Sequence, residues 1–139
     1  MNFRIVLSLS SMAVLMGAAT SFGLMQGLEW FFWLVLALFS AYLIAKRASK
    51  RPVGNGFLVG FLCGVLSSAT EALFIDSYII NNPASADRLA RMAQDADPRL
   101  FMLLSGATIG LAAGILFGVL ALLAARLEGG RPRPSKGES

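Results

Sequence analysis

The sequence predicts an all-α integral membrane protein, a bundle of four transmembrane helices with a short external amphipathic helix between the third and the fourth. Three observations predict this fold class. Hydrophobic residues make up 56% of the 139 positions and charged residues only 14%, against ~25% charged in soluble domains. The uncharged stretches are long, and most basic residues stand on one side of them. A single globule of this size has too little interior to bury so much apolar surface.

The first two uncharged stretches cover residues 5–28 and 30–45. A bilayer core of ~30 Å needs roughly 20 residues of helix, so we predict helices at about 3–25 and 28–46. The second stretch is the shorter, but it contains no helix breaker, and it can span if Glu29 lies at the interface.

The first stretch also permits a second interpretation, a cleaved signal peptide. Arg4 would form its basic region, residues 5–16 its apolar region, and the small residues at 17–19 its cleavage site. The apolar character continues beyond that site through Phe22, which favours a retained span. Both interpretations stay open at this point.

The third and fourth uncharged stretches, residues 52–70 and 100–125, predict the remaining spans at about 54–80 and 99–126. The fourth is long enough by itself. The third reaches a comfortable length for a bilayer when it continues past Glu71.

A short external segment joins these two spans. Asn82-Pro83 is typical of an N-cap followed by proline at the first helical position. Apolar residues at helical spacing follow, so we predict a short amphipathic helix on the outer membrane surface or capping the bundle. The alternative is a lid over a binding site. Asp97-Pro98 repeats the cap-then-proline pattern and predicts the start of the fourth span.

Lys and Arg are distributed asymmetrically. Nine of the twelve stand at the start of the first span, at or between the facing ends of the second and third, or at the end of the fourth and after it. The positive-inside rule therefore predicts that both termini are cytoplasmic. Residues 129–139 are polar and rich in Gly and Pro, which predicts a disordered cytoplasmic tail after a transmembrane domain at 1–128.

Small residues recur every four positions on the third and fourth spans, a pattern typical of a glycine zipper. This spacing leaves one helix face bare, so two such faces allow a close, antiparallel approach of backbones. The main interpretation is tight helix packing, and the alternative is a lipid-binding, pore or homo-oligomer surface. The predicted packing residues are Gly56, Gly60, Gly64, Ser68 and Ala72 on the third span and Gly106, Gly110, Gly114 and Gly118 on the fourth.

Glu71 is the one ionisable residue well inside a span. Such residues are candidates for function by default, because a charge in hydrocarbon is costly; the alternative is a protonated, hydrogen-bonded structural side chain. Asp76 is expected at the outer interface, level with Arg99, so these two are a plausible ion pair. The candidate hydrogen-bond partners of Glu71 are Ser67, Ser105 and Thr108.

The residue inventory excludes several chemistries. The chain has no His and a single Cys, Cys63, so a His/Cys metal cluster and a Ser-His or Cys-His nucleophile pair are impossible within it. We therefore expect no enzyme, no metal and no cofactor. The net charge of +4 is concentrated at the ends of apolar runs, which argues against a nucleic-acid partner. The expected partners are the lipid bilayer and a second copy or another membrane protein.

Three function classes remain. The first is a structural or accessory subunit or oligomeric scaffold that packs through its glycine faces, favoured by the small size and the lack of catalytic residues. The second is a small proton-linked transporter that uses Glu71. The third is a holin-like pore former.

Five segments follow one another in a recognisable order, at residues 54–64, 72–78, 81–83, 99–101 and 106–118. This order resembles a bacterial four-span membrane family catalogued as domain of unknown function 4199, although the external segment is shorter here. The resemblance implies a four-span fold in a bacterial inner membrane. It implies no activity and transfers no functional residues.

Overall fold

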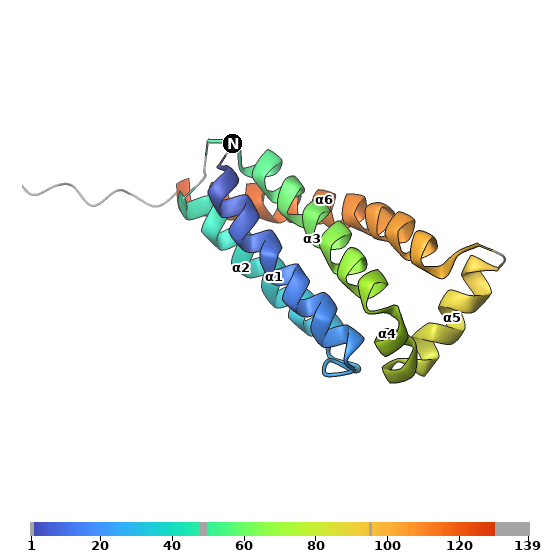
Figure 1. Cartoon of the computed structure of the whole chain (residues 1–139). Coiled ribbons are helices and arrows are strands. Elements are labelled where there is room, and N and C mark those ends of the chain that lie inside the picture. Colours follow the sequence, from blue (N-terminus) through green and yellow to red (C-terminus); the bar gives the residue numbers. More distant parts are fainter. Residues whose placement is uncertain (1, 48–49, 95, 130–139) are drawn as a thin grey trace, which may run out of the picture.

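The structure is a computed structural model that describes residues 2–47, 50–94 and 96–129. These residues form six α-helices and no strand (Figure 1): α1 (Phe3–Ser21), α2 (Glu29–Arg47), α3 (Pro52–Leu73), α4 (Ile75–Asn81), α5 (Pro83–Ala93) and α6 (Pro98–Gly129). The helices α1, α2, α3 and α6 are long and apolar enough to cross a membrane. The predicted all-helical class with four candidate spans is confirmed. The tail predicted at 129–139 lies outside the described residues, except for Gly129, which ends α6.

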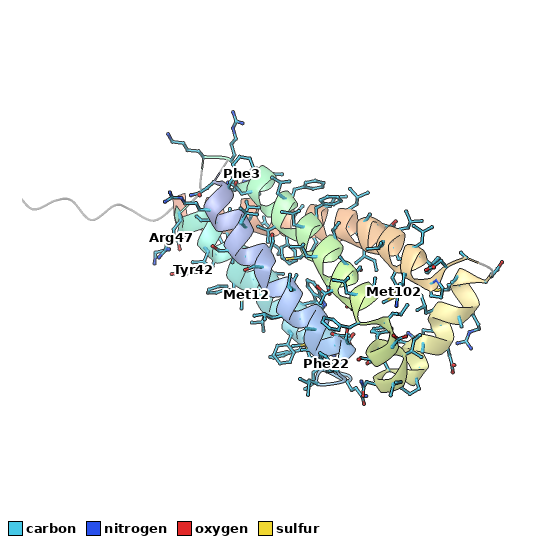
Figure 2. The ribbon with its side chains drawn as sticks, viewed as in Figure 1. Phe3, Met12, Phe22, Tyr42, Arg47 and Met102 are labelled. Carbon is cyan, nitrogen blue, oxygen red and sulfur yellow. The ribbon has the colours of Figure 1, made fainter. Side chains whose placement is uncertain are left out.

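The antiparallel pair α3 and α6 is the centre of the molecule. α1 packs on α3 and α2 packs on α6, whereas α2 and α3 contact each other much less. At the end of the molecule that holds Phe3 and Arg47 the four long helices come together (Figure 2). At the opposite end α3 and α6 diverge, and α5 crosses the gap between α4 and the start of α6 (Figure 1). The core is formed mainly by Val6, Leu9, Ala13, Leu36, Ile44, Val59, Cys63, Phe117 and Ala121.

The first helix is shorter than predicted and ends at Ser21 instead of residue 25. Gly23 has a positive φ of 71°, which is the left-handed conformation that glycine adopts at little cost after a helix. The amide of Gly23 donates to Thr20 (2.9 Å) and that of Leu24 to Ala19 (2.9 Å). These bonds satisfy carbonyls that the end of a helix leaves without partners.

The third predicted span, 54–80, is wrong as a single helix, because it breaks at Phe74 into α3 and α4. Neither Pro nor Gly stands at the break. Thr70 donates its hydroxyl to the carbonyl of Leu66 (2.8 Å), a contact that bends helices. The new direction of the chain brings the end of α4 to the end of α1, where polar contacts stabilise it.

These contacts come from two neighbouring amides, which we call the asparagine latch (Asn81 and Asn82). Asn82 donates to the carbonyl of Thr20 (2.8 Å) and Asn81 to that of Ser21 (3.3 Å). Both also donate to carbonyls of α4. The sequence places Asn82 correctly at the N-cap position of α5, but its side chain makes no capping bond there. Asp97 does cap: its Oδ1 accepts from the amide of Arg99 (2.7 Å) at the start of α6.

Candidate functional site

The small residues of α3 and α6 face one another within the chain and form what we call the glycine seam (Gly56, Gly60, Gly64 and Ser68 with Gly106, Gly110, Gly114 and Gly118). A Cβ on Gly60 would lie 2.5 Å from the carbonyl oxygen of Ala113, and one on Gly110 would lie 2.7 Å from that of Phe61. A Cβ on Gly64 would collide with the backbone of Gly110. Backbone therefore contacts backbone along the seam, which is the arrangement that small residues permit in membranes.

The seam stops where its spacing meets a large residue. Four residues before Gly106, α6 carries Met102, which is buried (6% exposed) against Ala72 and Ile75. Met102 lies on the side of α6 that faces the end of α3 (Figure 2). Because a methionine side chain keeps the two backbones apart, the helices separate here and leave room between them.

Glu71 stands in the last turn of α3, just beyond the seam. Its Oε1 accepts a hydrogen bond from the hydroxyl of Ser67 (3.0 Å). The negative end of a helix disfavours a carboxylate, so this position is not explained by helix stability. α1 supports the same turn, since a Cβ on Gly17 would lie 2.7 Å from the carbonyl oxygen of Ser67.

The apolar cavity, of about 510 Å³, lies between α2, α3 and α6. It is present because α2 and α3 contact each other little. Of its lining side chains, Trp30 is 68% exposed and Leu116 is 54% exposed, so in a bilayer the cavity opens toward lipid. Its walls are Trp30, Trp33, Leu34, Ala37, Gly64, Ser67, Ser68, Glu71, Ile109, Ala113, Leu116 and Phe117.

The polar cavity, of about 260 Å³, lies where α3 and α6 diverge, and α5 contributes residues to its wall. Its polar lining groups come from four helices: Ser68 and Glu71 from α3, Tyr78 from α4, Ser85 and Arg88 from α5, and Ser105 from α6. Leu89, Met92, Phe101, Met102 and Ile109 complete the wall. The hydroxyl of Tyr78 is a hydrogen-bond donor at neutral pH, and burial raises the pKa of Tyr78 further above neutral.

Three residues, Ser68, Glu71 and Ile109, line both cavities. The only carboxylate in the wall of either cavity is therefore reached from an apolar side and from a polar side. Ligand pockets are mostly apolar, with few convergent polar groups, and the two cavities together have this composition.

The other residues predicted to pair with the two acidic residues, Glu71 and Asp76, do not all lie near them. Ser105 lines the polar cavity, whereas Thr108 is exposed and donates to the carbonyl of Leu104 (3.2 Å). The expected Asp76–Arg99 ion pair was wrong: both side chains are exposed, and no ion pair joins them in the part of the chain that the structure describes. The turn at Phe74 carries Asp76 away with α4, and α5 lies between α4 and the start of α6 (Figure 1).

Sequence reasoning missed Tyr78, Ser85 and Arg88 as site residues. They meet Glu71 only because α4 and α5 fold back across the end of the bundle. The one signal available was the prediction that residues after Pro83 form a helix capping the bundle, which puts one face of that helix over the third span.

The fold and the site define a class: a helical chain with four helices able to cross a membrane and a carboxylate between two cavities. No family model, no curated protein and no solved structure matches the chain. The resemblance to the family of unknown function stays a prediction.

Proposed function

We propose that the chain is a multi-pass membrane protein that binds a small amphipathic molecule, with a cationic group of that molecule at Glu71 and its apolar part in the apolar cavity. The observation that carries this proposal is the position of Glu71 in the wall of that cavity. A cavity of about 510 Å³ is within the ~300–1,000 Å³ typical of small-molecule sites.

The chemistry of the wall fits a cation with an apolar body. A carboxylate in an apolar environment gains from a positive partner, and Trp30 and Trp33 offer aromatic faces that attract cations. If this ligand and a proton exchange on Glu71 and the ligand crosses the membrane, the protein is a small proton-linked transporter.

The test is binding of dodecylamine to the purified full-length chain in a non-ionic detergent. Trp30 and Trp33 are the only two tryptophans, and both line the apolar cavity, so intrinsic fluorescence reports on it directly. Glu71→Gln should weaken binding about tenfold or more, because a charge-assisted contact is lost.

Asp76→Asn is the matched control, because this carboxylate is exposed and lines neither cavity. It should bind dodecylamine like the wild type. Equal affinity of Glu71→Gln and Asp76→Asn would overturn the proposal. If Glu71→Gln is weakened, proton-driven flux of the amine in proteoliposomes separates a transporter from a binding protein.

A second candidate is the accessory subunit or oligomeric scaffold. The glycine seam bears on it: α3 and α6 use these faces for each other, so a partner would have to contact another surface. A stoichiometric partner in a gentle pull-down from native membranes would favour this candidate.

The proposed location is a bacterial inner membrane with both termini in the cytoplasm. Support comes from charge: Arg4, Arg47, Arg51 and Arg126 belong to helix ends that meet at one end of the bundle (Figure 1). The positive-inside rule makes that end cytoplasmic. α5 would then lie at the outer surface, as the external helix of the sequence prediction.

A further inference from the structure

We propose that Arg88 supplies a second binding group, so that the site takes a zwitterionic amphiphile with its ammonium group at Glu71 and its anionic group at Arg88. The inference rests on the proposed function and names the class of ligand. It starts from the polar cavity, which the cation site alone does not use.

The first observation is that an acid and a base share this cavity without meeting. Glu71 and Arg88 both line it, and Glu71 is bonded to Ser67. Among the described residues no ion pair joins Glu71 to Arg88. A negative and a positive side chain in the wall of one cavity favour a ligand that carries a positive and a negative group.

The second observation is the set of hydrogen-bond donors around Arg88. Tyr78 and Ser85 line the same cavity, and each carries a hydroxyl that can donate a hydrogen bond. A guanidinium with two neighbouring hydroxyls is suited to a phosphate or carboxylate, since the guanidinium donates in a planar fork. This end of the cavity therefore suits an anionic group.

The third observation is the size of the polar cavity and its position next to the apolar cavity. A volume of about 260 Å³ is below the ~300 Å³ at which whole-ligand pockets begin, so the polar cavity fits a headgroup better than a complete ligand. Ser68, Glu71 and Ile109 line both cavities, so the cavities are adjacent and a molecule held at Glu71 would have its headgroup on the polar side and its chain on the apolar side. The apolar cavity opens toward lipid, which is where such a molecule would reside.

The test compares three amphiphiles with the same twelve-carbon chain: dodecylamine, dodecyl phosphate, and lauroyl lysophosphatidylethanolamine, which carries both charges. Tryptophan fluorescence is the readout. The wild type should bind the zwitterion about tenfold more tightly than the amine, because it gains the contacts at Arg88.

Arg88→Gln should remove this tenfold preference and leave the affinity for the amine unchanged or higher, and Arg88→Lys should restore part of the preference. Arg91→Gln is the matched control, since Arg91 is on the same helix and is exposed like Arg88, but does not line the polar cavity. If Arg88→Gln and Arg91→Gln discriminate the three amphiphiles like the wild type, the inference is overturned.

Two further outcomes separate this inference from the proposed function. If Glu71→Gln leaves dodecylamine binding unchanged, the cation site fails, whereas loss of dodecyl phosphate binding in Arg88→Gln alone still supports the anionic half. If phosphoethanolamine without a chain competes as well as the lysolipid, the ligand is a water-soluble zwitterion, and the inference that the ligand is an amphiphile is overturned. If the wild type binds none of the three amphiphiles, both proposals fall.

Discussion

The two ends of the α3–α6 pair show how one spacing produces two kinds of structure. From Gly56 to Ser68 the backbones touch, and nothing larger than a hydrogen atom fits at several positions. Beyond Ser68 the same helices part around Met102, and the polar cavity lies there. The closed part holds the pair together, and the open part holds every ionisable group that lines the two cavities.

The difference teaches that the site depends on where the small residues stop. Glu71 is one turn beyond the last seam residue of α3, Ser68. A glycine at position 102 would extend the seam, whereas a large residue at position 64 would open it. The boundary between the two regions is therefore a property of a few side chains, and substitutions can move it.

The largest effect is expected from filling the closed part. Leucine at Gly64 or Gly110 would collide with the facing backbone, which cannot move aside like a side chain. We expect a loss of about 3 kcal/mol or more in the free energy of unfolding, at or above the upper range for overpacking. Thermal unfolding in detergent measures it.

Gly54→Leu is the control for this prediction, because a Cβ at Gly54 meets nothing within 4 Å. It should unfold at nearly the wild-type temperature. Wild-type stability of both Gly64→Leu and Gly110→Leu would show that the seam does not hold the pair together.

A smaller effect is expected from releasing the open part at the asparagine latch. Asn82→Asp keeps the shape of the side chain but removes the donor that reaches Thr20 and Tyr78. Both carbonyls keep a backbone donor, from Gly23 and from the amide of residue 82, but two side-chain hydrogen bonds are lost and a carboxylate oxygen faces carbonyl oxygens, which together should cost about 2–3 kcal/mol. Relative to the wild type, hydrogen exchange in Asn82→Asp should accelerate more in α4 and α5 than in the seam. Asp87→Asn, an exposed change on α5, should exchange like the wild type. Uniform exchange in Asn82→Asp would contradict a local role.

The smallest loss is expected from Met102→Ala, which moves the boundary. Burial of a methionine in a rigid core is worth ~2–5 kcal/mol on truncation to alanine, but here the helices can close, so we expect about 1 kcal/mol. Spin labels on Cys substitutions at Asp76 and Arg99 should come closer together when the helices close. These two positions can be labelled selectively, because both are exposed and Cys63 is fully buried. An unchanged distance would mean that Met102 does not keep the helices apart.

Composition and spacing predict the four candidate spans and the approach of α3 to α6, because hydropathy and small-residue periodicity are local properties of the chain. The turn at Phe74 has no such signal, since neither Pro nor Gly stands there. The partner of Asn82 is Thr20, distant in sequence, so no local pattern reveals it. The neighbours of Glu71 divide in the same way: Ser67 follows from helical spacing, whereas Arg88 depends on where α5 comes to lie.

The asparagine latch has a consequence for synthesis. α1 leaves the ribosome first, and the amide of Gly23 can already satisfy the carbonyl of Thr20, but the carbonyl of Ser21 receives its side-chain donor only after Asn81 has been translated. Until then water at the membrane surface must satisfy the Ser21 carbonyl, because hydrocarbon cannot. The first two helices therefore enter the membrane with that end hydrated, and the bundle acquires its final shape there only when the second half of the chain arrives.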